Sequence, residues 1–160
     1  MRIRQRIEDL GLTLPPPMVL PHGATLPFPW VRVHGRRAFV SGHGPLEADG
    51  SLARPLGKVG REVTLEQGYA SARQCAINHL AWLKVALGDL DRLQRVLKLN
   101  GYVNAVEGYN QGPWVVNGAS DFLVALLGPE RGSHARAVVS VAGLAFDAPV
   151  ETEMVLQIRP

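Results

Sequence analysis

The segment from Thr64 to Gly88 constrains the fold of this 160-residue chain more than any other. Thr64 and Gln67 have capping-box spacing, in which each side chain accepts a hydrogen bond from the other's backbone N–H at a helix start. Gly88 is a residue type that commonly follows the last turn of a helix. Between them, apolar residues recur every three or four positions, at Leu65, Tyr69, Ala72, Ala76, Leu80, Leu83 and Leu87. This spacing predicts an amphipathic helix of about six turns that buries its apolar stripe against another layer.

Strand-like segments flank this helix, and one further helix follows it. Residues 31–33 and 38–41 predict a hairpin, and residues 92–104 alternate in the manner of a strand. A second helix is expected from Pro113 to Gly128, followed by strands at 136–144 and 150–158. The order β-β-α-β-α-β-β predicts an α+β domain with two helices on one face of a sheet.

Two helices cannot cover both faces of such a sheet. We expect the uncovered face to carry Tyr102, Val138 and Val155 among charged residues. A sheet face with this much apolar surface is usually buried. Because no third long helix is available, the expected cover is another copy of the same chain.

The N-terminal residues 1–30 are expected to add a short helix and a proline-rich connector, packed on the domain formed by residues 31–160. The connector contains Pro15, Pro16 and Pro17, which favour an extended backbone. The first ten residues lack the apolar run of a secretory signal, and no apolar run is long enough to cross a bilayer. Cys75 is the only cysteine, so we expect a reducing, cytoplasmic location.

The charge distribution does not favour a nucleic-acid partner. The formal net charge is +3 and the sequence pI is about 9.4, but the basic residues are scattered along the chain without a basic run. Its five histidines show no helical pairing and no cysteine pair accompanies them, so no metal is expected. Phosphate-binding, dinucleotide-binding and Gly-x-Ser-x-Gly motifs are absent from the sequence.

Arg136 and Glu151 begin the last two predicted strands. If these strands form an antiparallel hairpin with a turn near residues 145–149, the two side chains lie close together. An ion pair with a structural role is one interpretation. A site for a carboxylate-bearing ligand is the other, because a guanidinium pairs with a carboxylate through two parallel hydrogen bonds.

The chain resembles a known family over essentially residues 31–158, most specifically around Arg136 and Glu151. The residues on which this resemblance rests are His-Ala-Arg-Ala-Val-Val-Ser-Val-Ala-Gly-Leu at 134–144 and Pro-Val-Glu-Thr-Glu at 149–153. They are similar to the C-terminal signature of the Rid family, the YjgF-like proteins once called L-PSP endoribonucleases. Val-Ser-Gly at 40–42 and Val-Asn-Gly-Ala at 116–119 are further similarities. Asn-Gly-Ala-Ser-Asp at 117–121 and the N-terminal helical segment indicate a particular branch.

The resemblance implies a chorismate-mutase-like fold, a homotrimer with clefts between subunits, and no metal or other cofactor. It also implies hydrolysis of enamines and imines, such as 2-aminoacrylate, to 2-keto acids and ammonia. By position, Arg136 would bind the substrate carboxylate and Glu151 would position the water. Ser41 and Asn117 would be polar residues of the cleft.

Three positions depart from the family pattern. Ala145 stands where proline is common, and His43 stands where glutamine usually follows Ser-Gly. His43 is therefore either an additional site residue or an ordinary loop residue. The aromatic residue expected near the cleft is either Phe28 or Trp30.

Three functional hypotheses follow from the sequence. The first is an enamine/imine deaminase, a hydrolase of C–N bonds. The second is a non-catalytic trimer that binds small carboxylates as a regulator or scavenger. The third is an RNA-cleaving or RNA-binding protein, against which the scattered charge argues.

Overall fold

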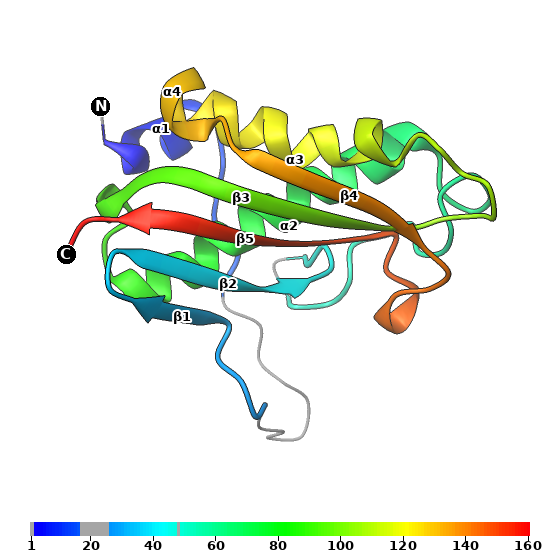
Figure 1. Cartoon of the computed structure of the whole chain (residues 1–160), viewed down its shortest axis with the longest axis horizontal. Coiled ribbons are helices and arrows are strands. Elements are labelled where there is room, and N and C mark those ends of the chain that lie inside the picture. Colours follow the sequence, from blue (N-terminus) through cyan, green and yellow to red (C-terminus); the bar gives the residue numbers. More distant parts are fainter. Residues whose placement is uncertain (1, 17–25, 48) are drawn as a thin grey trace.

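The computed structural model describes residues 2–16, 26–47 and 49–160 (Figure 1). Pro17, the last residue of the proline run, lies outside the described residues. The helices are α1 (Ile3–Asp9), α2 (Leu65–Leu87), α3 (Gly112–Leu127) and α4 (Pro129–Gly132), with 3-10 turns η2 (Leu90–Arg92) and η3 (Ala145–Asp147). The strands are β1 (Val31–His34), β2 (Arg37–His43), β3 (Leu93–Asn104), β4 (Ala135–Val141) and β5 (Val150–Ile158). This confirms the predicted order and adds the short helix α4.

Helix α2 begins and ends for the reasons predicted from its sequence. The Thr64 hydroxyl accepts from the backbone N–H of Gln67 at 3.2 Å, and the Gln67 side chain accepts from that of Thr64 at 2.9 Å. Gly88 ends the helix with a positive φ of 75°, a conformation that favours glycine. The stripe between these caps packs into the core.

The five strands form one sheet in the order β1-β2-β5-β3-β4. Strand β4 pairs with β3 in parallel, and β5 pairs antiparallel with both β2 and β3. The expected hairpin between the last two strands is therefore wrong, because β3 lies between them. Helix α3 crosses over from β3, and such a crossover returns the chain as a parallel neighbour.

Helices α2 and α3 approach each other closely at Gly118. A Cβ at this position would overlap the backbone carbonyl of Tyr69 on α2. Gly118 belongs to the Asn-Gly-Ala-Ser-Asp segment, so part of that motif serves helix packing. The contact fixes α3, which carries Asn117 toward β4.

One face of the sheet is covered by the helices, which lie behind it in Figure 1, and the other is bare. Tyr102 and Val155 lie on the bare face as predicted. Val138 does not: it pairs with Gly101 and packs against the buried core. Its neighbour Val139 pairs with Tyr102 and is 50% exposed on the bare face. Strand alternation explains the correction, because Arg136 and Val138 both face α3.

The N-terminal helix α1 packs on the helix side, where Ile3 and Ile7 join the core. The backbone N–H of Ile3 donates to the Asp91 carboxylate at 2.6 Å. Among the described helices, none combines the length and apolarity needed to span a bilayer.

Candidate functional site

Arg136 lies near the start of β4, and its side chain extends toward α3. Its Nη1 donates to Asn117 Oδ1 and to Ser120 Oγ, both at 2.9 Å, and its Nη2 donates to the Pro113 carbonyl at 3.3 Å. A guanidinium carries five N–H groups. Within the described part of the chain, Nε makes no hydrogen bond. The half-buried Arg136 is thus held by α3, and its Nε–H and one Nη2–H have no hydrogen-bond partner among the described residues.

Ser120 and His134 extend this network, although neither was expected from the sequence to be a site residue. Ser120 Oγ lies 3.0 Å from His134 Nε2, and His134 Nδ1 lies 2.6 Å from the Gly132 carbonyl oxygen. The pKa of His134 lies below its ordinary value, chiefly through burial and further through the Arg136 charge. Ser120 could have been found from its position three residues after Asn117, since residues so spaced share a helix face.

Glu151 and Glu153 lie on the bare face of β5. Glu153 accepts from Asn100 Nδ2 at 2.8 Å and from the Tyr102 hydroxyl at 3.0 Å. Glu151 pairs with Tyr102 on the neighbouring strand β3. It also lies against Gly42, where an added Cβ would overlap the Glu151 carboxylate. Partial burial raises the pKa of Glu151, and the neighbouring Glu153 charge raises it further. Glu151 therefore retains a proton to higher pH than an exposed glutamate does.

Ser41 lines a hollow of about 320 Å³ on the same face, together with Asn100, Glu153 and Phe28. Its hydroxyl donates to the Pro29 carbonyl at 2.9 Å. Phe28, rather than Trp30, is the aromatic candidate from the sequence that lines this hollow, and Phe39 lines it as well. Trp30 instead stacks on Trp82, with ring centroids 5.0 Å apart, and is not among the residues that line it.

Arg136 and Glu151 lie on opposite faces of the sheet. Arg136 pairs with Leu99, which faces the helices, and Glu151 pairs with Tyr102, which faces away from them. An ion pair between the two within one chain is therefore excluded. The structure brings Asn117 to Arg136 and brings Glu151 beside the Ser41-Gly42 segment, and it leaves these two groups apart.

His43 is buried rather than part of an open loop. Its ring centroid lies 4.4 Å from that of His79, and His79 Nε2 lies 2.9 Å from Thr152 Oγ1. Burial lowers the pKa of both histidines. His43 therefore packs beneath Ser41 and Gly42 and does not line the hollow.

Two chemistries find little support in the described residues. Cys75 is fully buried and its pKa is raised by burial, which makes it a poor nucleophile. Across residues 2–16, 26–47 and 49–160, no group of three or more His, Cys, Asp or Glu side chains could hold a metal ion.

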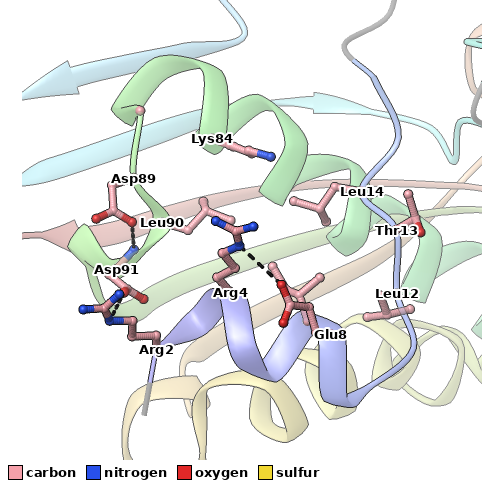
Figure 2. A pocket seen from close by; sticks show the side chains of 12 residues that line it. Arg2, Arg4, Glu8, Leu12, Thr13, Leu14, Lys84, Asp89, Leu90 and Asp91 are labelled. Carbon is pink, nitrogen blue, oxygen red and sulfur yellow. Dashed lines mark hydrogen bonds and ion pairs between the residues drawn. The ribbon is translucent and has the colours of Figure 1, made fainter.

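A separate hollow of about 810 Å³ lies between α1 and the end of α2 (Figure 2). Its charges are mixed and partly paired within the chain, as in the 3.3 Å contact between Arg4 and Glu8. None of the candidate site residues Ser41, Asn117, Arg136 and Glu151 lines it. This hollow is large, but its positive and negative side chains balance, so it offers no net positive charge to bind a carboxylate. We therefore do not take it as the functional site.

Residues 6–149 match the family described as "YjgF/chorismate_mutase-like, putative endoribonuclease". The chain belongs to this YjgF-like family. The family placement confirms the resemblance seen in the sequence, and the α+β fold with its five-stranded sheet agrees with it.

Two relatives match this YjgF-like chain over 99% of its length. "Protein TCP17" of Trypanosoma cruzi is 36% identical and covers 99% of this chain and 95% of its own. A protein of unknown function from Agrobacterium tumefaciens, Atu1372, is 38% identical with a TM-score of 0.87, covering 99% and 94% of the two chains. The YjgF product of E. coli, 20% identical, shares the fold with a TM-score of 0.61 over 92% and 96% of the chains.

Proposed function

We propose that this protein hydrolyses reactive enamines and imines that carry a carboxylate, yielding 2-keto acids and ammonia, at sites shared between copies of the chain. The observation that carries the proposal is the state of Arg136. Its guanidinium is oriented by Asn117, Ser120 and the Pro113 carbonyl, while Nε–H and one Nη2–H remain unused. A partly buried guanidinium with two unused N–H groups suits a small carboxylate.

Glu151 supplies the proton chemistry in this proposal. In the imine tautomer the C=N carbon is already electrophilic, so water adds to it and forms a C–O bond. Glu151 takes a proton from the attacking water and gives it to the imine nitrogen, which yields a carbinolamine. Glu151 then moves the proton of the carbinolamine hydroxyl to the nitrogen, so that the C=O bond forms as the C–N bond breaks and ammonia leaves. The raised pKa of Glu151 supports this role, because it brings the carboxylate closer to the working pH than an exposed glutamate, and proton transfer in both directions is most effective there.

A shared site follows from the geometry of the two half-sites. Arg136 faces the helix side of β4, at the edge of the sheet, and Glu151 faces the bare side of β5. One chain cannot present both groups to one small molecule. The bare face also carries the exposed apolar side chains Phe39 and Val139, which favours burial against further copies in a homotrimer.

The first experiment measures keto-acid formation from 2-aminoacrylate released by an amino-acid dehydratase. We expect acceleration by the wild type and a loss of roughly a hundredfold or more in kcat/KM for Arg136→Ala and Glu151→Gln, because each removes a group that contacts the substrate or the reacting water. Arg4→Ala is the matched control, since Arg4 is an exposed arginine that pairs with Glu8 and not with Asn117 or Ser120. If the wild-type protein does not raise the rate of keto-acid formation above the uncatalysed rate with any amino-acid-derived imine, the proposal is refuted.

Complementation tests whether the site is shared. Arg136→Ala retains Glu151, and Glu151→Gln retains Arg136, so co-expression of the two inactive variants creates some intact sites at subunit boundaries. Random mixing restores about a quarter of the wild-type sites. Recovery of no activity from a verified mixed oligomer would exclude a site built from two copies.

A non-catalytic carboxylate-binding protein is the second candidate. The Arg136 half-site is complete within one chain, so it could bind a keto acid without Glu151. In that case Arg136→Ala abolishes keto-acid binding, while Glu151→Gln leaves it unchanged and no turnover is found with wild type.

A further inference from the structure

The hydrogen-bond directions around His134 follow from its neighbours. The Gly132 carbonyl can only accept, so His134 Nδ1, 2.6 Å from it, carries the proton. In the neutral ring Nε2 is then the acceptor, and it receives the Ser120 O–H at 3.0 Å. A lone pair of Ser120 Oγ therefore faces Arg136 Nη1, which donates to it at 2.9 Å. The result is a chain of hydrogen bonds with one direction, from Arg136 through Ser120 and His134 to Gly132.

The neutral state of His134 agrees with its surroundings. Burial and the Arg136 charge both lower its pKa, and only the hydrogen bond with Gly132 raises it. A cationic ring would turn Nε2 into a donor and compete with Arg136 for the Ser120 oxygen. At neutral pH the chain of hydrogen bonds is thus intact.

We propose that Ser120 and His134 are positioning residues for Arg136: they hold the guanidinium so that Nε–H and one Nη2–H face the ligand carboxylate. The inference deepens the proposed function and rests on it for the identity of the ligand. Asn117 Oδ1 takes one Nη1 proton and Ser120 Oγ takes the other, so Nη1 is saturated and the guanidinium plane is fixed. An arginine held in this way loses less rotational freedom when it binds.

The main test measures binding of 2-ketobutyrate, which cannot be deaminated, by calorimetry. Ser120→Ala removes the acceptor, and we expect about tenfold weaker binding. Ser120→Thr keeps a hydroxyl and should bind within about twofold of wild type. Ser133→Ala is the matched control, because the Ser133 hydroxyl donates to the Pro129 carbonyl outside the network. Wild-type affinity in Ser120→Ala would overturn the proposal.

A double-mutant cycle tests the connection to His134. His134→Phe removes the acceptor that orients the Ser120 hydroxyl, and we expect it to weaken binding severalfold. In the Ser120→Ala background the same change should have no further effect, because the connecting hydroxyl is gone. Additive losses would show that His134 acts by another route.

An NMR measurement on the ligand-free protein separates failure of this inference from failure of the proposed function. The Nε–H resonance of Arg136 should be sharp in wild type and in Ser120→Thr, and broadened in Ser120→Ala by faster side-chain motion. If wild type binds no keto acid, the proposed function fails while this comparison still tests the positioning role. An Arg136 signal indifferent to Ser120→Ala would refute that role.

The kinetic constants of Ser120→Ala also distinguish a positioning role from a role in the chemical step. Ser120→Ala should raise KM while kcat changes by less than about twofold, because Ser120 touches neither the reacting carbon nor the water. A fall in kcat with KM unchanged would assign Ser120 a role in the chemistry and contradict the positioning role.

Discussion

Gly42 on β2 and Glu151 on β5 lie so close together that a Cβ at position 42 would overlap the Glu151 carboxylate. The strands pair antiparallel, with a shift in register between Val40 and His43 that places Gly42 beside the carboxylate. Bulges of this kind often redirect a side chain next to a functional site. Glycine at position 42 therefore leaves the Glu151 carboxylate in its place, and a substitution of Gly42 tests that position.

Gly42→Ala is expected to lower activity more than stability. The new methyl group meets the end of the flexible Glu151 side chain rather than backbone, so the carboxylate moves and the fold adapts. We expect at least a tenfold loss of kcat/KM in the aminoacrylate assay, because catalytic groups tolerate little displacement, and a small change in Tm. Gly143→Ala, at a position with open space around it, is the control. Wild-type activity in Gly42→Ala would show that Glu151 need not occupy its present position.

Local signals in the sequence predicted most of the elements. The Thr64 cap, the Gly88 stop and the apolar stripe between them all act within a few residues, so they define α2 without knowledge of the rest. Alternation placed Tyr102 and Val155 on the bare face in the same way. Arg136 was identified by the resemblance to the Rid family.

Strand order could not be predicted from such signals. Periodicity gives the two faces of a strand but not its neighbours, so the insertion of β3 between β4 and β5 was missed. That error placed Arg136 beside Glu151 and put Val138 on the wrong face. The Ser120–His134 contact joins α3 to the start of β4, and only the packing of the two elements reveals it.

Gly118→Ala is expected to destabilise the protein strongly. The added Cβ overlaps the backbone carbonyl of Tyr69, and α2 must move away from α3 to relieve the clash. Overpacking of this kind costs about 1–3 kcal/mol or more, measured as the free energy of unfolding in urea. Gly112→Ala is the matched control in the same helix, where the nearest atom is the Ser140 hydroxyl oxygen at 3.3 Å. Equal stability of the two variants would contradict the close helix contact.

The buried pair His43 and His79 should make the protein less stable in mild acid. Burial lowers the pKa of both rings in the folded state, so below about pH 6.5 the unfolded chain binds more protons than the folded one. Stability is then complete above pH 6.5 and falls as the pH decreases from there toward the lower folded values. Urea unfolding between pH 7.5 and 5.5 measures this slope, followed by tryptophan fluorescence, to which Trp30 beside His43 contributes. His79→Gln should reduce the slope, and an unchanged slope would mean that His79 is not the group that titrates.

Activity should have an acid limb set by Glu151 and tuned by Glu153. The pKa of Glu151 is raised by burial and by the Glu153 charge, so the ionised base is lost as the pH falls through a value above that of an exposed glutamate. Glu153→Gln removes the neighbouring charge, which lowers the pKa of Glu151 and moves the limb of the kcat/KM profile to lower pH. Asp49→Asn is the control, since it removes a carboxylate from an exposed loop. If the limb moves upward or stays in place in Glu153→Gln, another group is the base, and Glu151 is left with a binding role.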